Sequence, residues 1–352
     1  MNLPIEKFYP LYPLATADCF NASATSPFGS HVEYHSSGRS ALFSMLAKVD
    51  ITKGSGKKIW LPRFFCPSVV RSLYDICDIE FFEDLPTESE PRFDTITPKE
   101  GDAVMAVNFF GLRNMDCWVD WKRENPNILL FENLSHVPFS KHCGVAKETF
   151  ASLRKTLPLA DGGVLFTDSP KEFFLKPASE MSLFASDFLA ASVMRSGYAS
   201  YGDNSEDLFY SAEAKLEATK RVSRISKYSM ETLFKLNIPL LIKRRADAVR
   251  AFATASKKYT DTFEVLIFND GDCPDENIFQ PILKFKEPSD RDKVYNSLRK
   301  LKMFAPIYWG GFGNVATSHT LKESHKLLCV PIDFRHTEAE ASAFAEFIYS
   351  LC

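Results

Sequence analysis

The feature that most constrains the fold is a series of short, unbroken apolar runs separated by helical patterns in the first half of the chain. Five runs are predicted as strands: Lys58–Pro62, Ile79–Glu83, Asp102–Asn108, Asn127–Asn133 and Val164–Asp168. Because a strand that is apolar along its whole length is buried on both faces, this pattern is typical of a parallel sheet covered by helices. Ligands of such sheets bind beyond the carboxyl ends of the strands, so the residues that follow each run are the first candidates for a site.

The rest of the chain predicts further helices and a second, smaller α/β unit. Pro67–Asp78 is predicted as a helix, and residues 205–259 are mostly helical, with a break at Asn237–Pro239. The smaller unit has predicted strands at Phe279–Phe285, Ala305–Trp309 and Leu327–Ile332, and predicted helices at Asp290–Lys300 and Thr337–Leu351. We therefore expect an α/β protein with a large domain, residues 1–240, and a small C-terminal domain, residues 241–352.

The composition argues against several classes of function. With 42 Lys and Arg against 45 Asp and Glu, the 352 residues carry a formal net charge of −3, so no basic excess indicates nucleic acid or an anionic membrane. The basic run Lys243–Arg245 falls in an amphipathic helical pattern and is predicted to be a solvated helix face. No apolar run approaches the roughly 18 residues that span a membrane, and the first residues do not resemble a signal peptide.

The cysteines and histidines do not predict a metal centre. The eight cysteines form no CxxC pair, and the seven histidines do not cluster with them at the spacing of metal ligands. A chain of this size does not need disulfides for stability, and free thiols suit the reducing cytoplasm. We therefore expect no metal and a cytoplasmic protein.

Three segments combine residue types that suit a ligand site, and each also has a simpler interpretation. Ser37–Leu42 begins a helix, where free backbone N–H groups can hold a phosphate, although a plain helix cap has the same pattern. Leu130–His136 is an apolar strand that becomes polar at its carboxyl end, which suits either a ligand or local hydrogen bonds. Ile307–Gly311 places aromatic residues before a glycine pair, and they either line a pocket mouth or pack in the core.

A fourth segment, Ser152–Gly163, contains a candidate nucleophile. It places two cations and a hydroxyl group in a non-periodic loop, which Asp-Gly-Gly turns into a strand. A lysine held in a cleft can lose its proton and form an imine, which an arginine cannot do. Lys155 is therefore a candidate for covalent chemistry, and the alternative interpretation is an exposed basic loop.

Taken in order, these segments resemble the DegT-type family of sugar aminotransferases, which depend on pyridoxal 5'-phosphate (PLP). The resemblance runs from about residue 26 to the C-terminus, and it rests on the joint order and spacing of the motifs. The matching segments are Ser37–Leu42, similar to the family's SGxxAL phosphate turn; Leu61–Pro67, similar to its strand toward the cofactor; Val107–Gly111, similar to VHLYG; Phe131–His136, similar to IEDxAH; Lys155 with Gly162 and Gly163, similar to the cofactor lysine and its glycine turn; and Asp290–Asp292, Pro306–Trp309 and Leu328–Asp333, similar to the small-domain signature.

This resemblance implies a fold and a role for Lys155. The fold would be that of the type I PLP transferases, with a mostly parallel central sheet in the large domain and a smaller C-terminal α/β domain. Lys155 would carry PLP as a Schiff base. After release by an amino donor, its amine would move the proton between Cα of the substrate and C4' of the cofactor.

The resemblance also implies which residues surround the cofactor. The phosphate would be held by Gly38, Arg39, Ser40 and Ser152. The ring would be contacted by His136 near its phenolic oxygen, by Asn133 at the pyridine nitrogen, and by Phe64 or Phe65 as the stacking aromatic.

The sequence departs from the family pattern at several of these positions. Asn133 stands where the family has an aspartate, Asn108 replaces a histidine, and Cys66 occupies the position expected for the stacking aromatic. Glu132 should not substitute for that aspartate, because adjacent strand residues face opposite sides of a sheet. The serine lies three residues before the lysine rather than five, and the family's GxNxxM segment has no clear counterpart other than Gly202–Asn204.

Three functions remain open at this point. The leading interpretation is an aminotransferase that moves an amino group from L-glutamate to a keto group of a nucleotide-linked sugar. A PLP-dependent sugar dehydratase of the same fold is a second, although Lys155 argues against it because known dehydratases of this type have a histidine there. A non-catalytic or regulatory relative that binds PLP without turnover is the third, and Asn133 supports it. The resemblance also implies a homodimer, with the Gly162–Gly163 turn permitting close approach of the chains at the subunit interface.

Overall fold

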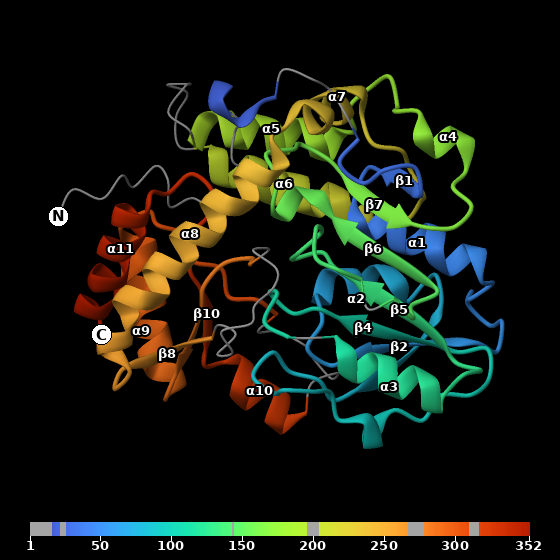
Figure 1. Cartoon of the computed structure of the whole chain (residues 1–352), viewed down its shortest axis with the longest axis horizontal. Coiled ribbons are helices and arrows are strands. Elements are labelled where there is room, and N and C mark those ends of the chain that lie inside the picture. Colours follow the sequence, from blue (N-terminus) through green and yellow to red (C-terminus); the bar gives the residue numbers. More distant parts are fainter. Residues whose placement is uncertain are drawn as a thin grey trace.

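The protein is built around a seven-stranded, mostly parallel sheet (Figure 1). The computed structural model describes residues 16–21, 26–113, 115–142, 144–195, 204–266, 278–309 and 317–352. The strands are β1 (Val32–His35), β2 (Lys58–Pro62), β3 (Asp78–Phe82), β4 (Ala103–Val107), β5 (Leu129–Asn133), β6 (Glu148–Ser152) and β7 (Gly163–Phe166), in the spatial order β1-β7-β6-β5-β4-β2-β3. Strands β2 to β6 are parallel, and β7 runs antiparallel to both its neighbours.

The five strands predicted from apolar runs are confirmed, and the other two strands of this sheet, β1 and β6, were not predicted. β1 and β6 contain charged or polar residues that mask the apolar pattern, yet every residue of both strands is buried. Glu33 in β1 is fully buried because its carboxylate is matched by His35 Nε2 at 3.3 Å and Lys48 Nζ at 3.3 Å. Buried charges of this kind persist only when they are paired, and local sequence patterns do not show such pairing.

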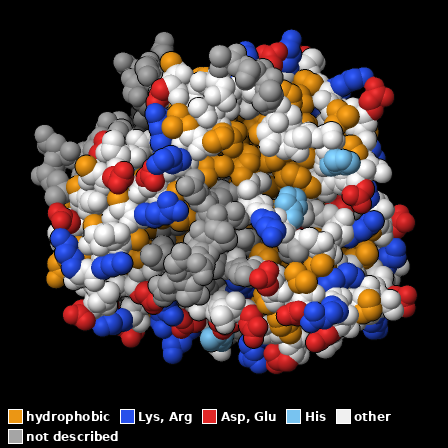
Figure 2. Space-filling view, in the orientation of Figure 1, with side chains coloured by type: hydrophobic (Ala, Val, Ile, Leu, Met, Phe, Trp, Pro, Cys, Tyr) orange, Lys and Arg blue, Asp and Glu red, His pale blue; other side chains and the backbone are white. Residues whose placement is uncertain are grey.

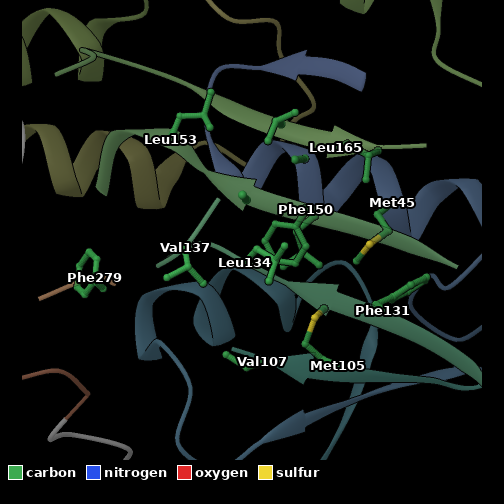
Figure 3. Close-up of a cluster of buried hydrophobic side chains, with 14 of the residues drawn as sticks. Met45, Met105, Val107, Phe131, Leu134, Val137, Phe150, Leu153, Leu165 and Phe279 are labelled. Carbon is green, nitrogen blue, oxygen red and sulfur yellow. The ribbon is translucent and has the colours of Figure 1, made fainter. Parts of the chain in front are cut away.

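Alternate residues of the central strands pack against helices on opposite faces of the sheet. The large-lobe helices are α1 (Gly38–Lys48), α2 (Pro67–Leu73), α3 (Asp116–Glu124), α4 (Glu172–Leu175), α5 (Leu183–Arg195), α6 (Ser205–Ala218) and α7 (Lys227–Lys235). In β4, Met105 and Val107 belong to the core that α1 covers, which Figure 3 shows in close-up, whereas Val104 and Ala106 pack with Trp118 of α3. Burial on both faces explains why these strands have no polar side.

The C-terminal part forms a smaller α/β lobe on the left of Figure 1. It comprises α8 (Ile238–Ser256), β8 (Phe263–Leu266), β9 (Ile282–Phe285), α9 (Pro288–Lys300), α10 (Ser318–Ser324), β10 (Leu327–Cys329) and α11 (Glu338–Ser350), with an antiparallel sheet in the order β10-β9-β8. α8 connects the lobes, because Leu241 near its start packs in the large-lobe core and Phe252 near its end packs in the small-lobe core. The domain boundary expected near residue 240 falls in the first turn of this helix and stays a prediction.

Most of the helix predictions are confirmed, and three predictions of other kinds or of helix ends need correction. The predicted break at Asn237–Pro239 is confirmed, because Asn237 caps α8 by accepting the Leu240 N–H at 3.3 Å. α2 ends at Leu73 rather than at Asp78, since Asp78 already pairs with Lys58 in the sheet. The predicted strand at Ala305–Trp309 does not form, and the run Lys243–Arg245 is not wholly solvated, because Arg245 is only 3% exposed.

The surface of the described residues mixes charges of both signs. On the face in Figure 2, Lys and Arg side chains lie among Asp and Glu side chains. No helix among the described residues is long and apolar enough to cross a membrane.

The strand β7 begins with a glycine because the backbone of the α1 cap lies directly against it. A Cβ atom at Gly163 would lie 2.2 Å from the carbonyl carbon of Ser37 and 2.5 Å from the nitrogen of Gly38. Gly162 donates its N–H to Ser36 O at 2.8 Å, and its φ of 145° also favours glycine. Gly162 and Gly163 were expected to permit close approach between subunits, and here they permit close approach between β7 and the cap of α1 in the same chain.

We predict that Gly163→Ala lowers the free energy of unfolding by about 3 kcal/mol or prevents folding, because the methyl group meets backbone that cannot move aside. Urea unfolding measures this loss. Gly144→Ala is the matched control, since Gly144 has φ 79° and open space around its Cβ position. The control should lose only about 1 kcal/mol, the cost of a left-handed alanine. Equal losses in the two variants would contradict the packing argument.

Candidate active site

A cavity of about 310 Å³ lies at the carboxyl ends of the central strands. Its walls include residues that end or follow β4, β5 and β6, together with the start of α1 and the segment 304–309 of the small lobe. This is the position that a doubly wound parallel sheet predicts for a ligand. Of the residues predicted for the site, those that line the cavity are Gly38, Arg39, Phe65, Asn133, His136, Ser152 and Lys155.

Ser40 and Phe64 were also predicted for the site, but neither is among the residues that line the cavity. The Ser40 hydroxyl donates to Ser223 O at 3.0 Å and accepts the Ser223 N–H at 2.8 Å, so it faces away from the cavity. Phe64 is fully buried in the core, with its ring centroid 5.5 Å from that of Phe109. Phe65 and Cys66 line the cavity in its place.

The first turn of α1 provides backbone donors and a buried cation. Ser37 caps the helix by accepting the Ser40 N–H at 3.1 Å, and the N–H groups of Gly38 and Arg39 precede the first intrahelical bonds. The guanidinium of Arg39 is fixed by bonds to Leu216 O at 2.9 Å and Ser68 Oγ at 3.0 Å. Burial lowers the pKa of Arg39, but an arginine remains charged at neutral pH. An anion is therefore the natural ligand of this turn.

Two asparagines lie side by side at the ends of β4 and β5. The N–H of Asn108 donates to Asn133 O at 3.2 Å, and both side chains line the cavity. Asn133 Oδ1 accepts the Ser135 N–H at 2.9 Å, which leaves its Nδ2 donor available to a ligand. Asn108 Oδ1 is buried without a hydrogen-bond partner. Such an orphaned acceptor is costly unless a ligand or water satisfies it.

The neighbouring Glu132 faces the other side of the sheet, as expected from strand alternation. It is fully buried, and its Oε2 accepts the Thr149 Oγ1 hydrogen at 2.9 Å. Glu132 is not among the residues that line the cavity. No bulge therefore brings its carboxylate to the position of Asn133.

Lys155 lies at the end of the 3-10 turn η4 (Leu153–Lys155), with its Nζ 3.1 Å from Nε2 of His136. The other nitrogen of that ring, Nδ1, accepts the Phe110 N–H at 3.2 Å and so carries no proton. Burial lowers the pKa of His136 well below its ordinary value, so the ring is neutral with its proton on Nε2. An Nε2–H can only donate, and Lys155 can accept only as a neutral amine. Burial likewise lowers the pKa of Lys155.

Aromatic rings from both lobes enclose this pair. The His136 ring stacks on Phe110, with centroids 4.6 Å apart, and on Phe279 at 4.7 Å. Trp309 also stacks on His136 at 5.5 Å, and Lys155 Nζ lies 5.7 Å from the centroid of its ring. Tyr308 and Trp309 both line the cavity, so the pocket interpretation of this segment is correct for these two residues. Gly310 and Gly311 lie outside the described residues.

Sequence reasoning missed two charged residues of the cavity. Arg154 precedes Lys155, is buried, and places its guanidinium carbon 4.5 Å from the Phe188 ring centroid. Its position directly before Lys155 in the sequence could have identified it as a residue of the site. Glu213 reaches the cavity from α6, and nothing in the helical pattern there marks it. The segment Gly202–Asn204 was the candidate counterpart of GxNxxM. Only its last residue, Asn204, which precedes α6, lies within the described residues.

The site combines an anion-binding turn, amide groups and a buried lysine amine whose pKa is lowered. Among the described residues, no group of three His, Cys, Asp or Glu side chains could hold a metal ion. The arrangement therefore suits covalent attack by Lys155 on a carbonyl compound that also carries an anionic group.

We predict that Lys155 reacts by reductive methylation with a pH midpoint below 10.5, its ordinary value. Only the neutral amine reacts, and burial and the His136 Nε2–H both favour that form. His136→Phe keeps an aromatic ring but removes the donor, so the midpoint should move upward. Mass spectrometry of the peptide that contains Lys155 measures the rate at each pH. A wild-type midpoint at or above 10.5, or no change in the variant, would contradict this assignment.

Solved structures with a similar fold include sugar aminotransferases. A protein described as a sugar aminotransferase from Streptococcus pneumoniae, in its PLP form, matches with a TM-score of 0.65 and 11% identity, over 97% of this chain and 98% of that chain. PseC from Helicobacter pylori, an aminotransferase involved in the biosynthesis of pseudoaminic acid, matches with a TM-score of 0.63 and 11% identity, over 98% of each chain. A DegT DnrJ EryC1 StrS aminotransferase from Brucella abortus has a TM-score of 0.58 and 16% identity, over 91% of this chain and 86% of that chain.

Sequence comparison gives no such match, since no family model and no curated protein matches this chain. The likeness is therefore one of structure over nearly the whole length, and it confirms the fold class expected from the motifs. The chain has the fold of the DegT-type sugar aminotransferases.

Proposed function

We propose that this protein is a PLP-dependent aminotransferase that moves an amino group from L-glutamate to a keto group of a nucleotide-linked sugar. The observation that carries the proposal is the position of Lys155, whose amine lies 3.1 Å from His136 Nε2 in a cavity with an anion-binding turn. The fold shared with sugar aminotransferases solved in PLP forms supports the same function. The identity of the donor and the sugar acceptor rests on the family resemblance of the motifs.

The residues of the cavity fit PLP by charge and hydrogen-bonding capacity. The phosphate would bind at the N–H groups of Gly38 and Arg39, with the Ser152 hydroxyl beside them. The orphaned Asn108 Oδ1 offers an acceptor to the ligand, and Asn133 offers its Nδ2 donor to the ring nitrogen. The cavity volume of about 310 Å³ suits a small cofactor, at the lower end of the range for ligand pockets.

When bound, PLP would supply an electron sink for the carbanion formed at Cα of the amino donor. The protein itself would hold the cofactor through Lys155 Nζ, and the same amine, once released, would take the proton from Cα. His136 Nε2 would orient this amine toward the reacting carbon. Tyr308 and Trp309 would help to exclude water from the site, because they line the cavity on the side of the small lobe.

In the same proposal the protein is a cytoplasmic homodimer. All six cysteines in the described part of the chain are free, which suits a reducing compartment. The dimer rests on the resemblance alone, since the Gly162–Gly163 turn packs within its own chain. Light scattering of the cofactor-loaded protein measures the oligomeric state.

We predict that purified protein loaded with PLP is yellow and that borohydride fixes the cofactor on the peptide containing Lys155. L-Glutamate should bleach the visible absorbance, because a transaminase releases its lysine when it accepts the amino group. A PLP binder without turnover would keep its colour, which separates the two functions. Cofactor fixed on another lysine, or full colour in Lys155→Ala, would contradict the assignment of Lys155.

We predict that Asn133→Asp speeds the glutamate half-reaction by about ten- to thirtyfold, equivalent to about 1–2 kcal/mol. One carboxylate oxygen can keep the Ser135 N–H bond, and the other places a negative charge at the ring nitrogen. That charge favours a protonated ring, which accepts electrons better than a neutral one. Stopped-flow absorbance measures the rate. An unchanged rate with cofactor still bound would mean that ring protonation is not limiting or that Asn133 does not face the nitrogen.

A further inference from the structure

The helix α8 carries a buried cation on its apolar face. Lys243 is solvent-exposed and pairs with Asp247, and Arg244 is half-buried and pairs with Asp18. Arg245, the next residue, is only 3% exposed. It shares the buried face with Leu241 and Val249, four residues before and after it, so helix geometry directs it into the protein.

The guanidinium of Arg245 ends at the turn that carries Lys155. Its Nη2 donates to the carbonyl oxygen of Thr156, the residue directly after Lys155. Thr156 is 2% exposed, so this carbonyl has little access to water as an alternative partner. The remainder of the turn is closed by its own backbone, because the N–H groups of Thr156 and Leu157 both donate to Leu153 O. The Arg245 bond therefore connects the lysine turn to a separate element of the fold.

A carboxylate of the small lobe also favours the charged form of Arg245. Burial lowers the pKa of Arg245 to about 10, and the charge of Asp333 opposes this shift, so the side chain remains a cation at neutral pH. Asp333 follows β10 and is held by Arg335 at 2.7 Å. The adjacent Phe334 has its ring centroid 6.0 Å from the guanidinium carbon of Arg245. A buried cation thus lies between the lysine turn and the loop that begins at Asp333.

We propose that Arg245 is a positioning residue for Lys155 and acts on it through the Thr156 carbonyl. In this role Arg245 also couples Lys155 to the small-lobe loop that contains Asp333. This inference rests on the proposed role of Lys155 as the cofactor lysine. With Thr156 O fixed, η4 has one arrangement, and Lys155 Nζ stays beside His136 Nε2. Without this bond the turn has more conformations, and fewer of them present the amine to the cavity.

The experiment compares Arg245→Met, Arg245→Gln and Arg245→Lys with the control Arg250→Met, in the full-length protein. Arg250 lies on the same helix with an exposed side chain and only a distant partner, Asp247 at 3.9 Å. Two quantities are measured: hydrogen exchange of the peptide 153–162 in cofactor-free protein, and the rate at which added PLP is captured on Lys155. Exchange of the α11 peptide reports global stability in the same samples.

Loss of a charge-assisted hydrogen bond predicts at least about tenfold faster exchange of peptide 153–162 and about tenfold slower capture in Arg245→Met and Arg245→Gln. Exchange in α11 should be unchanged, Arg245→Lys should recover part of both effects, and Arg250→Met should match the wild type.

If Arg245→Met does not fold, Arg245→Gln decides. Wild-type exchange in peptide 153–162 of a folded Met or Gln variant overturns the proposal, as does an equal rise in α11 exchange. Failure of the wild type itself to capture PLP would overturn the proposed function, and the exchange data would still decide whether Arg245 holds the turn.

Discussion

The site depends on the contact between two stretches of backbone, the cap of α1 and the start of β7. Ser37 and Gly38 approach Gly163 so closely that a methyl group has no room between them. A Cβ at Gly38 would in turn meet the Cβ of Ser152 at 2.9 Å. This contact places the anion-binding turn against the end of β6, from which the Lys155 turn begins. The start of α1 and the turn of Lys155 therefore line one cavity, because Gly38 and Gly163 allow the start of α1 to lie directly against β6 and β7.

The chemistry of Lys155 follows from how its surroundings use their hydrogen-bonding groups. A backbone N–H occupies Nδ1 of His136, which leaves the other nitrogen as a donor toward the lysine amine. The stacked rings of Phe110 and Phe279 keep water from the imidazole, so the charged form of either partner is disfavoured. Burial and the His136 Nε2–H thus both favour the neutral form of Lys155, which attacks carbonyl compounds.

The hydrogen-bonding groups of Asn133 and Asn108 show what changes at two positions that depart from the family pattern. Asn133 has its oxygen engaged by the Ser135 N–H and offers only a donor, whereas an aspartate would offer a charge. Asn108 supplies an unpaired acceptor on the neighbouring strand. Both residues occupy the strand ends expected from the motif order, so the fold positions them as it would position the usual residues. What changes is the charge that these two positions present to the cavity.

The sequence by itself determined the sheet strands with unbroken apolar runs, the glycine turn after Lys155 and seven residues that line the cavity, because these depend on local pattern and spacing. Only the tertiary structure decided the burial of β1, the place of Ser40 and Phe64 outside the cavity, and the contributions of Glu213 and Arg245. Glu33 in β1 and Arg245 in α8 read as surface charges along the chain, yet partners distant in sequence allow them to be buried. Such burial depends on three-dimensional pairing and packing, which a one-dimensional pattern of polar and apolar residues does not contain.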